Sequence, residues 1–561
     1  MQVAPVASAS AADAASVPGG SGQMFASAPV CARTMPAPAP APMPAKPDAT
    51  ITVPADPRLA TPALASKDLT WQVGDERIDY TATAGHIDVR GDTGALIGKM
   101  FALSYVAKPW MEDDGRSEHH ACAAEEKGSS VADTGRADAT DSSAALRPVT
   151  FCYNGGPGSS SVPINFGGIG PRRVKTDGTN HLNLPAVVED NPSTLLRQSD
   201  LVFLDALGTG YSALAEGTDP TTVFGVDGDA DAFCRAIIGW LDANQRWGSP
   251  VYLFGESYGT VRNAVLMRLL GERCVPVRGV VMLSALFDWV QTLPGEDLYF
   301  LGMLPTYAAT ARYFGRAGAK ADEETWFDDA MAFTETTYAP ALLRGDRLPA
   351  REKAQVAKKI SRLIGLPADL IERYNLRVDL DTFRRSLLAD EGRVIGRLDM
   401  RFASAAPLPL QGSTAFFAAE DAADDAVEPV WTAAFRAFLQ EIGYAGAPIY
   451  LTQNYEVVNE HWKWEHREPG MEESAPAPNV AYDIAVALKR NPTMRIAILG
   501  GRYDAATTYW NVVHDISCLF LPPELKERIS FHLYSCGHMA YVDEPTLEQM
   551  GLDMASFYAA S

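Results

Sequence analysis

The spacing of apolar and polar residues changes along the chain, and each change predicts a different kind of element. Short alternating segments come first and are typical of an antiparallel meander at the edge of a sheet. Buried-looking strands then alternate with helical stretches, which is typical of a mostly parallel sheet and therefore of the α/β class. The alternating segments are 70–73, 77–82, 87–90 and 100–106, and the later strands are 149–153, 201–205, 251–254 and 279–285.

Helical periodicity marks three further parts of the chain. In the stretch 230–247, Phe233, Ile237, Trp240 and Leu241 recur at helical spacing and predict a stripe that packs on the sheet. From about 288 to 405 charged amphipathic stretches such as 351–364 predict a helical insertion over the sheet. The sheet pattern then returns in the predicted strands 495–499 and 529–534 and the helix 507–516 between them.

These patterns divide the chain into four predicted parts. Residues 1–66 form an Ala/Pro-rich arm that is predicted to be disordered, because such a composition cannot pack a core. The core of the fold is predicted in two pieces, 67–287 and 481–561, with a mainly helical cap inserted at 288–480. A polar, acidic loop at 111–146 interrupts the first piece, and its pair His119 and His120 is interpreted as part of a solvated loop and not as a metal site.

Charge and composition exclude several classes of function. The 561 residues carry a formal net charge of −22, which repels nucleic acid and anionic membrane surfaces, so neither is an expected partner. No apolar run approaches the roughly 18 to 20 residues of a membrane helix, and we expect a soluble protein. Residues 1–10 have neither a basic n-region nor an apolar h-region, so no secretory signal is visible and the compartment stays open.

The seven cysteines are odd in number and widely spread, without a Cys-x-x-Cys spacing. They indicate neither a disulfide framework nor a zinc site. No cofactor and no metal is expected. Cys536, two residues before His538, is interpreted as a small buried hydrophobic residue.

One short motif carries the strongest chemical signal. Residues 251–259 read Val-Tyr-Leu-Phe-Gly-Glu-Ser-Tyr-Gly, an apolar strand that ends in Gly-x-Ser-x-Gly and leads into the apolar helical stretch 261–270. This strand, turn and helix context predicts a nucleophile elbow, in which a sharp turn exposes the hydroxyl of Ser257. Such a serine can attack a carbonyl carbon.

Two later loops hold the partners that a nucleophilic serine needs. Asp504 follows the strand 495–499 and His538 follows the strand 529–534, so the chain order is Ser, Asp, His. Functional groups of an open α/β sheet gather beyond the carboxyl ends of its strands, where all three residues are placed. The sequence therefore predicts a catalytic triad of Ser257, Asp504 and His538.

Taken together, these blocks resemble the serine carboxypeptidase family, peptidase family S10 of the α/β-hydrolase fold, and particularly its bacterial branch. The resemblance rests on motifs that stand in the family's order and cover roughly residues 68–555. It is compatible with a periplasmic or secreted location. The motifs are Asn-Gly-Gly-Pro-Gly-Ser-Ser-Ser at 154–161, Phe-Leu-Asp-Ala-Leu-Gly-Thr-Gly-Tyr-Ser at 203–212, Gly-Glu-Ser-Tyr-Gly at 255–259, the acid loop 500–504 and Gly-His-Met at 537–539.

The resemblance implies a mostly parallel central sheet with a helical cap, and an exopeptidase that releases C-terminal residues of peptides through an acyl-enzyme. Ser257 would be the nucleophile, His538 the general base and then acid, and Asp504 the group that orients the imidazole. The backbone N–H groups of Gly156 and Tyr258 would form the oxyanion hole. A glycine-rich loop suits that role because its backbone can approach the substrate closely.

A carboxypeptidase must also bind a free terminal carboxylate. In the family, the Asn of the oxyanion block and the Glu before the serine do so, which assigns substrate binding to Asn154, to Gly155 in the same loop and to Glu256. A carboxyl group beside a substrate carboxylate should have a raised pKa, because two like charges at short range cannot both stay ionised. We therefore expect peptidase activity to favour acidic pH.

The chain departs from the family pattern in the carboxylate-binding block. Cys152 stands where many members have Trp, and Gly168 stands where a second Glu is expected. Arg172, Arg173 and Arg262 could replace the missing pair with a bidentate guanidinium, although ordinary salt bridges are the favoured interpretation. Ser159 replaces the family's Cys after Asn-Gly-Gly-Pro-Gly, which removes one disulfide partner.

Three interpretations of function stay open. The leading one is a serine carboxypeptidase, and the second is a related esterase or acyltransferase with the same triad on a non-peptide substrate, since one scaffold hosts many acceptors. The third is a catalytically silent binding or scaffold protein. The presence of all three triad residue types argues against this third interpretation. The aromatic cluster at 461–464, His-Trp-Lys-Trp, is expected either to line the substrate cleft or to pack in a core or lid.

Overall fold

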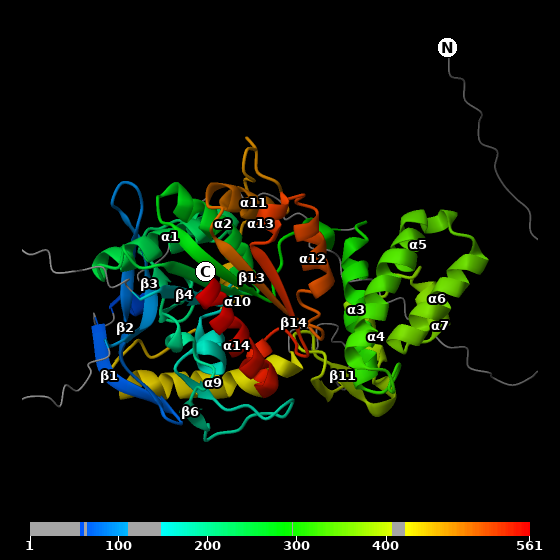
Figure 1. Ribbon diagram of the computed structural model, residues 1–561, viewed down its shortest axis with the longest axis horizontal. Coiled ribbons are helices and arrows are strands. Elements are labelled where there is room, and N and C mark those ends of the chain that lie inside the picture. The colour runs from blue at the N-terminus through cyan, green and yellow to red at the C-terminus, as the bar shows by residue number, and fades with distance from the viewer. Residues whose placement is uncertain (1–55, 61–63, 110–146, 294, 407–420) are drawn as a thin grey trace, which may run out of the picture. The chain divides into compact units, whose positions relative to one another are not determined.

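The computed structural model describes residues 56–60, 64–109, 147–293, 295–406 and 421–561, and most of them are organised around one sheet of ten strands (Figure 1). The strand order is β1-β2-β3-β7-β4-β9-β10-β13-β14, and β8 pairs with β3. The strands are β1 (Leu64–Val73), β2 (Glu76–Arg90), β3 (Leu96–Ala107), β4 (Val149–Tyr153), β7 (Asp200–Leu204), β8 (Ala213–Leu214), β9 (Val251–Glu256), β10 (Val277–Leu283), β13 (Arg495–Gly501) and β14 (Ile529–Tyr534).

The antiparallel meander at one edge is confirmed, with two differences from the prediction. β2 is a single strand of 15 residues where the sequence pattern indicated two, because it pairs with β1 on one side and β3 on the other through the stretch 83–86 that breaks the alternation. β1 begins at Leu64, within the range assigned to the N-terminal arm. Residues 1–55 of that arm, and the loop 111–146 with His119 and His120, lie outside the described residues.

Six strands of the sheet, β7, β4, β9, β10, β13 and β14, run parallel to one another and carry the functional loops. Every residue of β4 and of β9 is buried, which fits their continuous apolar sequences, because a central parallel strand is covered on both faces. Parallel strands present their carboxyl ends at the same edge. The mostly parallel sheet and its covering helices make this an α/β-hydrolase fold, as the sequence predicted.

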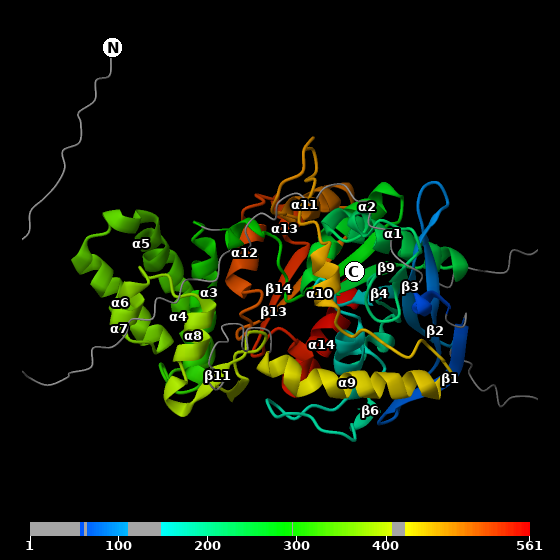
Figure 2. The ribbon, with the colours of Figure 1, turned by 180° about the vertical axis from the view of Figure 1, so that it is seen from behind.

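Helices cover the two faces of the sheet in separate layers. On one face α1 (Val226–Ala243), α2 (Tyr258–Glu272) and α11 (Ala481–Arg490) pack against β4, β9 and β10, and on the other lie α9 (Ala422–Glu441) and α14 (Glu544–Ala560), as Figures 1 and 2 show. The predicted stripe of Phe233, Ile237, Trp240 and Leu241 is buried in the first layer.

The helix α9 corrects the predicted cap boundary. It belongs to the segment 288–480 that was assigned to the cap, yet it is part of the core beneath the sheet. Its buried residues Val427, Trp431, Phe435 and Phe438 lie along one side of the helix at spacings of four, four and three. Burying that stripe against the sheet removes more apolar surface from water than an exposed cap position would allow.

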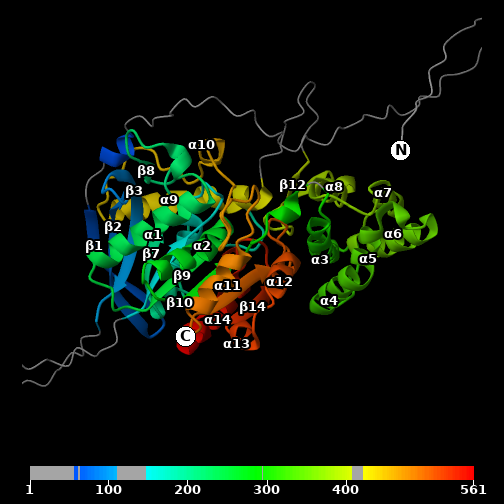
Figure 3. The same ribbon diagram turned by 90° about the horizontal axis from the view of Figure 1, so that it is seen from above.

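The cap itself is the helical region that precedes α9. Its helices form a hydrophobic cluster of their own, in which the rings of Tyr307 and Phe383 stack at 4.0 Å, and Figure 3 shows them beside α12 (Tyr509–Ser517). The helices are α3 (Leu298–Tyr313), α4 (Glu323–Phe333), α5 (Ala339–Arg344), α6 (Ala350–Ile364), α7 (Ala368–Arg373) and α8 (Leu380–Ser386). The predicted amphipathic stretch 351–364 is thus confirmed as a helix.

Short elements complete the fold. They are β5 (Arg172–Val174), β6 (Val188–Asp190), β11 (Arg393–Ile395), β12 (Ala403–Ala405), α10 (Tyr455–Glu460) and α13 (Pro523–Lys526). Over the described ranges, no helix has the length and apolarity that crossing a membrane would require. Nor does any group of three or more His, Cys, Asp or Glu side chains within those ranges have an arrangement that could hold a metal ion.

Candidate active site

The strand β9 turns into α2 at Ser257, and this turn has the geometry of a nucleophile elbow. Ser257 has φ 58° and ψ −128°, a positive-φ conformation that non-glycine residues rarely adopt. Its amide donates a 2.9 Å hydrogen bond to the Leu283 carbonyl of β10. A Cβ atom at Gly255 would lie 2.3 Å from the Gly259 carbonyl oxygen, so the motif needs glycine for the strand and helix to approach this closely.

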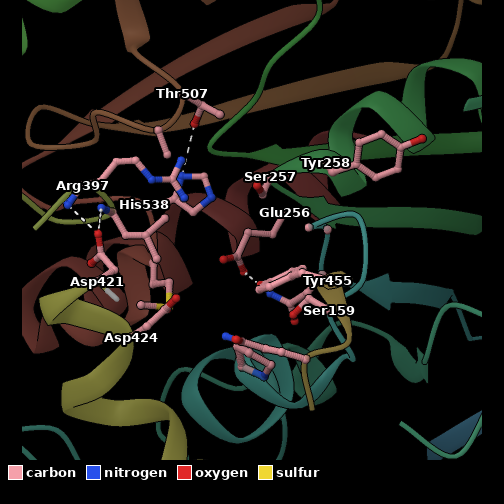
Figure 4. Close-up of a pocket in the computed structure, with 18 of the residues that line it drawn as sticks. Ser159, Glu256, Ser257, Tyr258, Arg397, Asp421, Asp424, Tyr455, Thr507 and His538 are labelled. Atoms are coloured by element: carbon pink, nitrogen blue, oxygen red, sulfur yellow. Dashed lines mark hydrogen bonds between the residues drawn. The ribbon is translucent and has the colours of Figure 1, made fainter. Parts of the chain in front are cut away.

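Ser257 opens into a cavity of about 510 Å³ at the carboxyl edge of the parallel strands. The cavity is also lined by His538, Glu256, Asn154 and Gly156, and Figure 4 shows His538 and Glu256 next to the serine. In the described residues no hydrogen bond joins the Ser257 hydroxyl to the His538 ring. Such contacts are often long in unliganded enzymes and tighten when substrate binds.

The carboxylate of Asp504 is held against His538. Nδ1 of His538 lies 2.8 Å from Oδ2 of Asp504, whose other oxygen accepts hydrogen bonds from the amides of Ala506 and Thr507 at 2.8 and 3.0 Å. Burial opposes protonation of the ring, but the adjacent carboxylate outweighs it, and the pKa of His538 is raised above its usual value. This pairing suits an imidazole that must accept a proton and hold it briefly.

The main chain of His538 is fixed from two directions. Its amide donates a 2.7 Å hydrogen bond to the carbonyl of Leu398 in the segment after the cap helices, and its carbonyl accepts a 2.6 Å bond from the hydroxyl of Ser284. The preceding amide, of Gly537, donates to the carboxylate of Asp399 at 3.1 Å. The cap segment therefore supports the histidine loop directly.

The residues predicted to form the oxyanion hole come from the loop 154–161 and from the start of α2. Gly156 and Tyr258 both line the cavity, and Tyr258 begins α2, whose N-terminus favours negative charge. A Cβ atom at Gly155 would lie 2.4 Å from the Tyr258 amide nitrogen, so only glycine permits this approach. The loop and the helix N-terminus can thus direct amide donors at one oxygen atom.

The motif at 203–212 supports this loop from behind. Asp205, which is fully buried, accepts hydrogen bonds from the amide and the hydroxyl of Ser161, both at 2.8 Å. Its second oxygen accepts from the hydroxyl of Tyr450 at 2.8 Å. A substitution at Asp205 would leave these buried donors unpaired and release the loop that carries Gly156.

The predicted carboxylate-binding pair is in contact. Nδ2 of Asn154 donates to Oε2 of Glu256 at 2.9 Å, while Oδ1 of Asn154 accepts from the Ile164 amide at 3.0 Å and so fixes the orientation of the amide. Burial raises the pKa of Glu256 to about 7, and the Asn154 contact lowers it only in part. Glu256 is therefore protonated at acidic pH.

Tyr541 occupies the space beside Gly168, the residue that stands where many members of the resembled family have a second Glu. A Cβ atom at Gly168 would lie 3.0 Å from the Tyr541 ring, and the Tyr541 hydroxyl donates a 2.8 Å hydrogen bond to Oε2 of Glu256. The side chain that contacts Glu256 beside Gly168 is thus a tyrosine from the histidine loop. The only feature of the sequence that could have indicated this contact is the position of Tyr541, three residues after His538.

The three arginines considered as replacements for the missing pair are engaged in structural ion pairs. These pairs are Arg172 with Glu441 at 2.7 Å, Arg173 with Glu544 at 2.5 Å and Arg262 with Asp229 at 2.6 Å. Arg262 also donates to the Asn154 carbonyl at 2.9 Å, so it supports the oxyanion block without lining the cavity. The salt-bridge interpretation is confirmed for all three.

Other charged residues, which the sequence analysis did not single out, line the cavity. Arg384 and Arg397 come from the cap region, and Asp424 and Glu428 lie one turn apart on α9. Burial raises the pKa of Asp424 to about 6 and that of Glu428 to about 8. These residues lie far from the recognised motifs in the sequence, so no pattern linked them to the site.

The remaining candidates have packing roles. The ring of Trp462 meets that of Tyr258 at 5.0 Å and the ring of Trp464 meets that of Trp289 at 4.2 Å, and neither Trp462 nor Trp464 lines the cavity. Cys536 is fully buried, as expected of a small hydrophobic residue.

Known proteins are similar in sequence to the part of this chain that contains the elbow. Residues 138–270 match the family model described as serine carboxypeptidase, a span that contains Asn154, Gly156 and Ser257 but neither Asp504 nor His538. Two Arabidopsis thaliana proteins are similar over part of their length. Serine carboxypeptidase-like 50 is 31% identical over 166 residues, and serine carboxypeptidase-like 36 is 29% identical over 116 residues.

These alignments are partial. They cover 28% and 20% of this chain and 35% and 22% of the respective relatives. Among solved structures, the proline iminopeptidase of Mycobacterium smegmatis aligns over 85% of this chain and 97% of its own with 11% identity and a TM-score of 0.33. The family similarity is thus concentrated in the part of the chain that holds the elbow and the oxyanion loop.

Proposed function

We propose that the protein is a serine-type carboxypeptidase, which hydrolyses the C-terminal bond of a peptide with Ser257 as nucleophile. The observation that carries this proposal is the shared cavity, in which Ser257, the Asp504-paired His538 and the Asn154–Glu256 pair all lie. The match of residues 138–270 to the serine carboxypeptidase family model supports the same reaction class.

The proposed reaction begins with acylation. His538 takes the proton of the Ser257 hydroxyl as Oγ attacks the scissile carbonyl carbon, and Asp504 stabilises the imidazolium that forms. The amides of Gly156 and Tyr258 stabilise the negative oxygen of the tetrahedral intermediate. His538 then gives its proton to the leaving amine, and the C-terminal residue departs.

Deacylation repeats these steps with water. His538 takes a proton from a water molecule whose oxygen attacks the acyl carbon, and returns the proton to Ser257 as the ester bond breaks. The Asn154 and Glu256 side chains would hold the terminal carboxylate of the substrate, Glu256 as a neutral acid that donates a hydrogen bond. Two negative charges would otherwise be forced together.

A related esterase or acyltransferase is the second candidate, and one observation favours it. The position of the expected second Glu is occupied by Gly168 and the Tyr541 ring, so the acid pair of the carboxypeptidase pattern is reduced to Glu256 alone. An enzyme acting on uncharged esters has no need of such a pair.

The test compares three substrates with one acyl group. A blocked dipeptide with a free C terminus, its C-terminal amide and a short aryl ester are offered to the wild-type protein and to Ser257→Ala. The proposal predicts that the free dipeptide is cleaved with a kcat/KM at least tenfold above that of the amide, and that Ser257→Ala cleaves none. Cleavage of the aryl ester alone would overturn the carboxypeptidase proposal in favour of the second candidate.

A further inference from the structure

We propose that Arg397 binds the negatively charged end of the leaving group, which in a peptide substrate is the α-carboxylate of the C-terminal residue. This inference rests on the proposed function and adds a recognition residue to it. The carboxylate would be held between a permanent cation from the cap region and the Asn154–Glu256 pair of the core.

Arg397 differs from Arg384, the other arginine of the cavity lining, in that its side chain has no partner among the described residues. The Arg384 guanidinium donates to the carbonyl of Ile395 at 2.6 Å and lies 3.7 Å from the carboxylate of Asp381. Within the described ranges, the guanidinium of Arg397 makes neither a hydrogen bond nor an ion pair, and the residue is exposed to the cavity that Ser257 lines. An unpaired guanidinium in an active-site cavity is available to bind an anion.

The backbone of Arg397 is nevertheless firmly placed. Its amide donates a 2.6 Å hydrogen bond to Asp421, the N-cap residue of α9 (Figure 4). Its carbonyl accepts a 3.1 Å hydrogen bond from the amide of Ala505, in the loop after Asp504. The side chain therefore starts from a point tied both to the core helix and to the acid loop. Such anchoring lowers the entropy cost of holding a ligand.

Its charge acts on the catalytic histidine. Burial is the largest influence on the pKa of His538 and lowers it, the carboxylate of Asp504 raises it, and the charge of Arg397 is close enough to the ring to lower it by a smaller amount. Figure 4 shows the Arg397 side chain extending from its Asp421 contact toward the His538 end of the cavity. A carboxylate bound by Arg397 would thus lie near the histidine that protonates the leaving amine, as a C-terminal residue requires.

The acidic residues around the cavity do not neutralise this cation by direct contact. Asp421 is satisfied by backbone amides, at 2.6 Å from Arg397 and 3.1 Å from Leu398. Asp424, Glu428 and Glu256 have raised pKa values of about 6, 8 and 7, so they become neutral as the pH falls through these values. The other titratable and charged groups that line this cavity are Asp381, Arg384, Tyr258, Tyr455 and His538.

Glu256 and Arg397 would bind the substrate carboxylate over different ranges of pH. Glu256 can donate to a carboxylate only while it is protonated, whereas a guanidinium stays charged at every pH at which the protein is folded. Arg397 would keep KM for a free-carboxylate substrate low at neutral pH, where Glu256 has begun to lose its proton. Loss of Arg397 should therefore be felt most at pH 7 and above.

The experiment uses Arg397→Gln in the full-length protein, with Arg385→Gln as the matched control. Arg385 is the exposed neighbour of Arg384 on α8, outside the cavity lining, so its substitution removes the same charge from the same region. Values of kcat and KM are measured at pH 5.5 and 7.5 for the free blocked dipeptide and the aryl ester. Arg397→Lys tests whether charge alone restores binding.

The inference predicts a selective loss. In Arg397→Gln, KM for the free dipeptide rises at least tenfold at pH 7.5, the loss expected for a charge-assisted hydrogen bond, and the ratio of kcat/KM for the free dipeptide to kcat/KM for the aryl ester falls at least tenfold. Arg397→Lys recovers part of the loss, and Arg385→Gln behaves as wild type. An unchanged KM, or an equal loss on peptide and ester, overturns the inference.

Failure of this inference differs from failure of the proposed function. If wild type prefers the free dipeptide over its amide and Arg397→Gln keeps that preference, only the proposed role of Arg397 is disproved. If wild type itself shows no such preference, the carboxypeptidase proposal falls and the role of Arg397 falls with it. Thermal unfolding midpoints of the variants, expected to match wild type within about 2 °C, exclude misfolding as the cause of a lost activity.

Discussion

The hydroxyl of Tyr541 donates a 2.8 Å hydrogen bond to Oε2 of Glu256, the oxygen that also accepts from Asn154. Both contacts are therefore on one carboxyl oxygen. In the described residues Oε1 has no hydrogen bond, and Glu256 lines the cavity beside Ser257. When Glu256 is protonated on Oε1, that hydroxyl is free to donate to a substrate carboxylate.

The first prediction concerns pH. The pKa of Glu256, raised by burial to about 7, keeps the group protonated below that pH, and deprotonation above it would repel a substrate carboxylate. We expect kcat/KM for the free blocked dipeptide to fall as pH rises through about 7, and the fall to disappear in Glu256→Gln. The aryl ester, which has no carboxylate, supplies the control profile. A wild-type peptide profile that rises steadily from pH 4 to pH 9 would contradict this role.

The second prediction concerns Tyr541→Phe. This change removes the hydrogen bond that stabilises the ionised form of Glu256 and keeps the ring that packs on Gly168. The pKa of Glu256 should rise further, so the alkaline fall in kcat/KM should move to higher pH by about half a unit or more. Tyr534→Phe is the matched control, because it removes a tyrosine hydroxyl that donates to Asp553 away from the cavity. An unmoved profile in Tyr541→Phe would show that the contact has no influence on Glu256.

The third prediction concerns Thr507, which the sequence analysis did not identify. Its hydroxyl lies 2.7 Å from Oδ2 of Asp504 and 3.3 Å from Nδ1 of His538, so it packs on the acid–histidine contact itself. Thr507→Val should lower kcat about tenfold, as expected for one lost hydrogen bond to a charged group, whereas Thr507→Ser should stay within about threefold of wild type. Equal kcat values for the two variants would rule out a role for the hydroxyl.

The fourth prediction concerns stability. His466 is fully buried between two carboxylates, with Nδ1 2.7 Å from Asp227 and Nε2 2.8 Å from Asp483. Burial opposes its protonation, but these partners prevail and raise its pKa from 6.5 to about 9. The doubly protonated ring therefore links the segment around 466 to α1 and α11.

A raised pKa in the folded state gives stability that is fully present below the unfolded pKa of about 6.5 and is lost as pH rises through about 9. The contribution is on the order of 3 kcal/mol, because the pKa rises from 6.5 to about 9 and each tenfold change in proton affinity corresponds to about 1.4 kcal/mol. The free energies of unfolding in urea are measured for wild type and His466→Gln between pH 6 and 10. The two values should differ at pH 6 and become equal towards pH 10. His461→Gln, at a histidine without an ion pair in the described residues, is the control. A constant difference across that range would contradict the linkage.

Local sequence was sufficient for the central strands and for the elbow. β4 and β9 are continuous apolar runs. Gly255 and Gly259 flank Ser257, whose positive φ belongs to a sharp turn between strand and helix. These features depend on neighbours within a few residues. The position of Asp504 and His538 after two strands of the same parallel sheet was predictable for the same reason.

The contacts that complete the site depend on residues far apart in the chain. Tyr541 reaches Glu256 across 285 positions, and α9 packs beneath the sheet although its amphipathic pattern fits a cap helix equally well. Arg397 lies in a segment without any catalytic motif and reaches the cavity only because Asp421 and Ala505 anchor it there. No periodicity in a single sequence encodes such pairings.

The central claim is that Ser257 is an activated nucleophile, and covalent labelling tests it most directly. A fluorophosphonate probe should modify wild type at Ser257, identified by mass spectrometry, and should react with Ser159→Ala at a similar rate, because Ser159 lines the same cavity without a triad partner. Asp504→Asn should react at least 100-fold more slowly. The account predicts no labelling of Ser257→Ala, and it is contradicted if wild type is inert to the probe or if Ser257→Ala is labelled as fast as wild type.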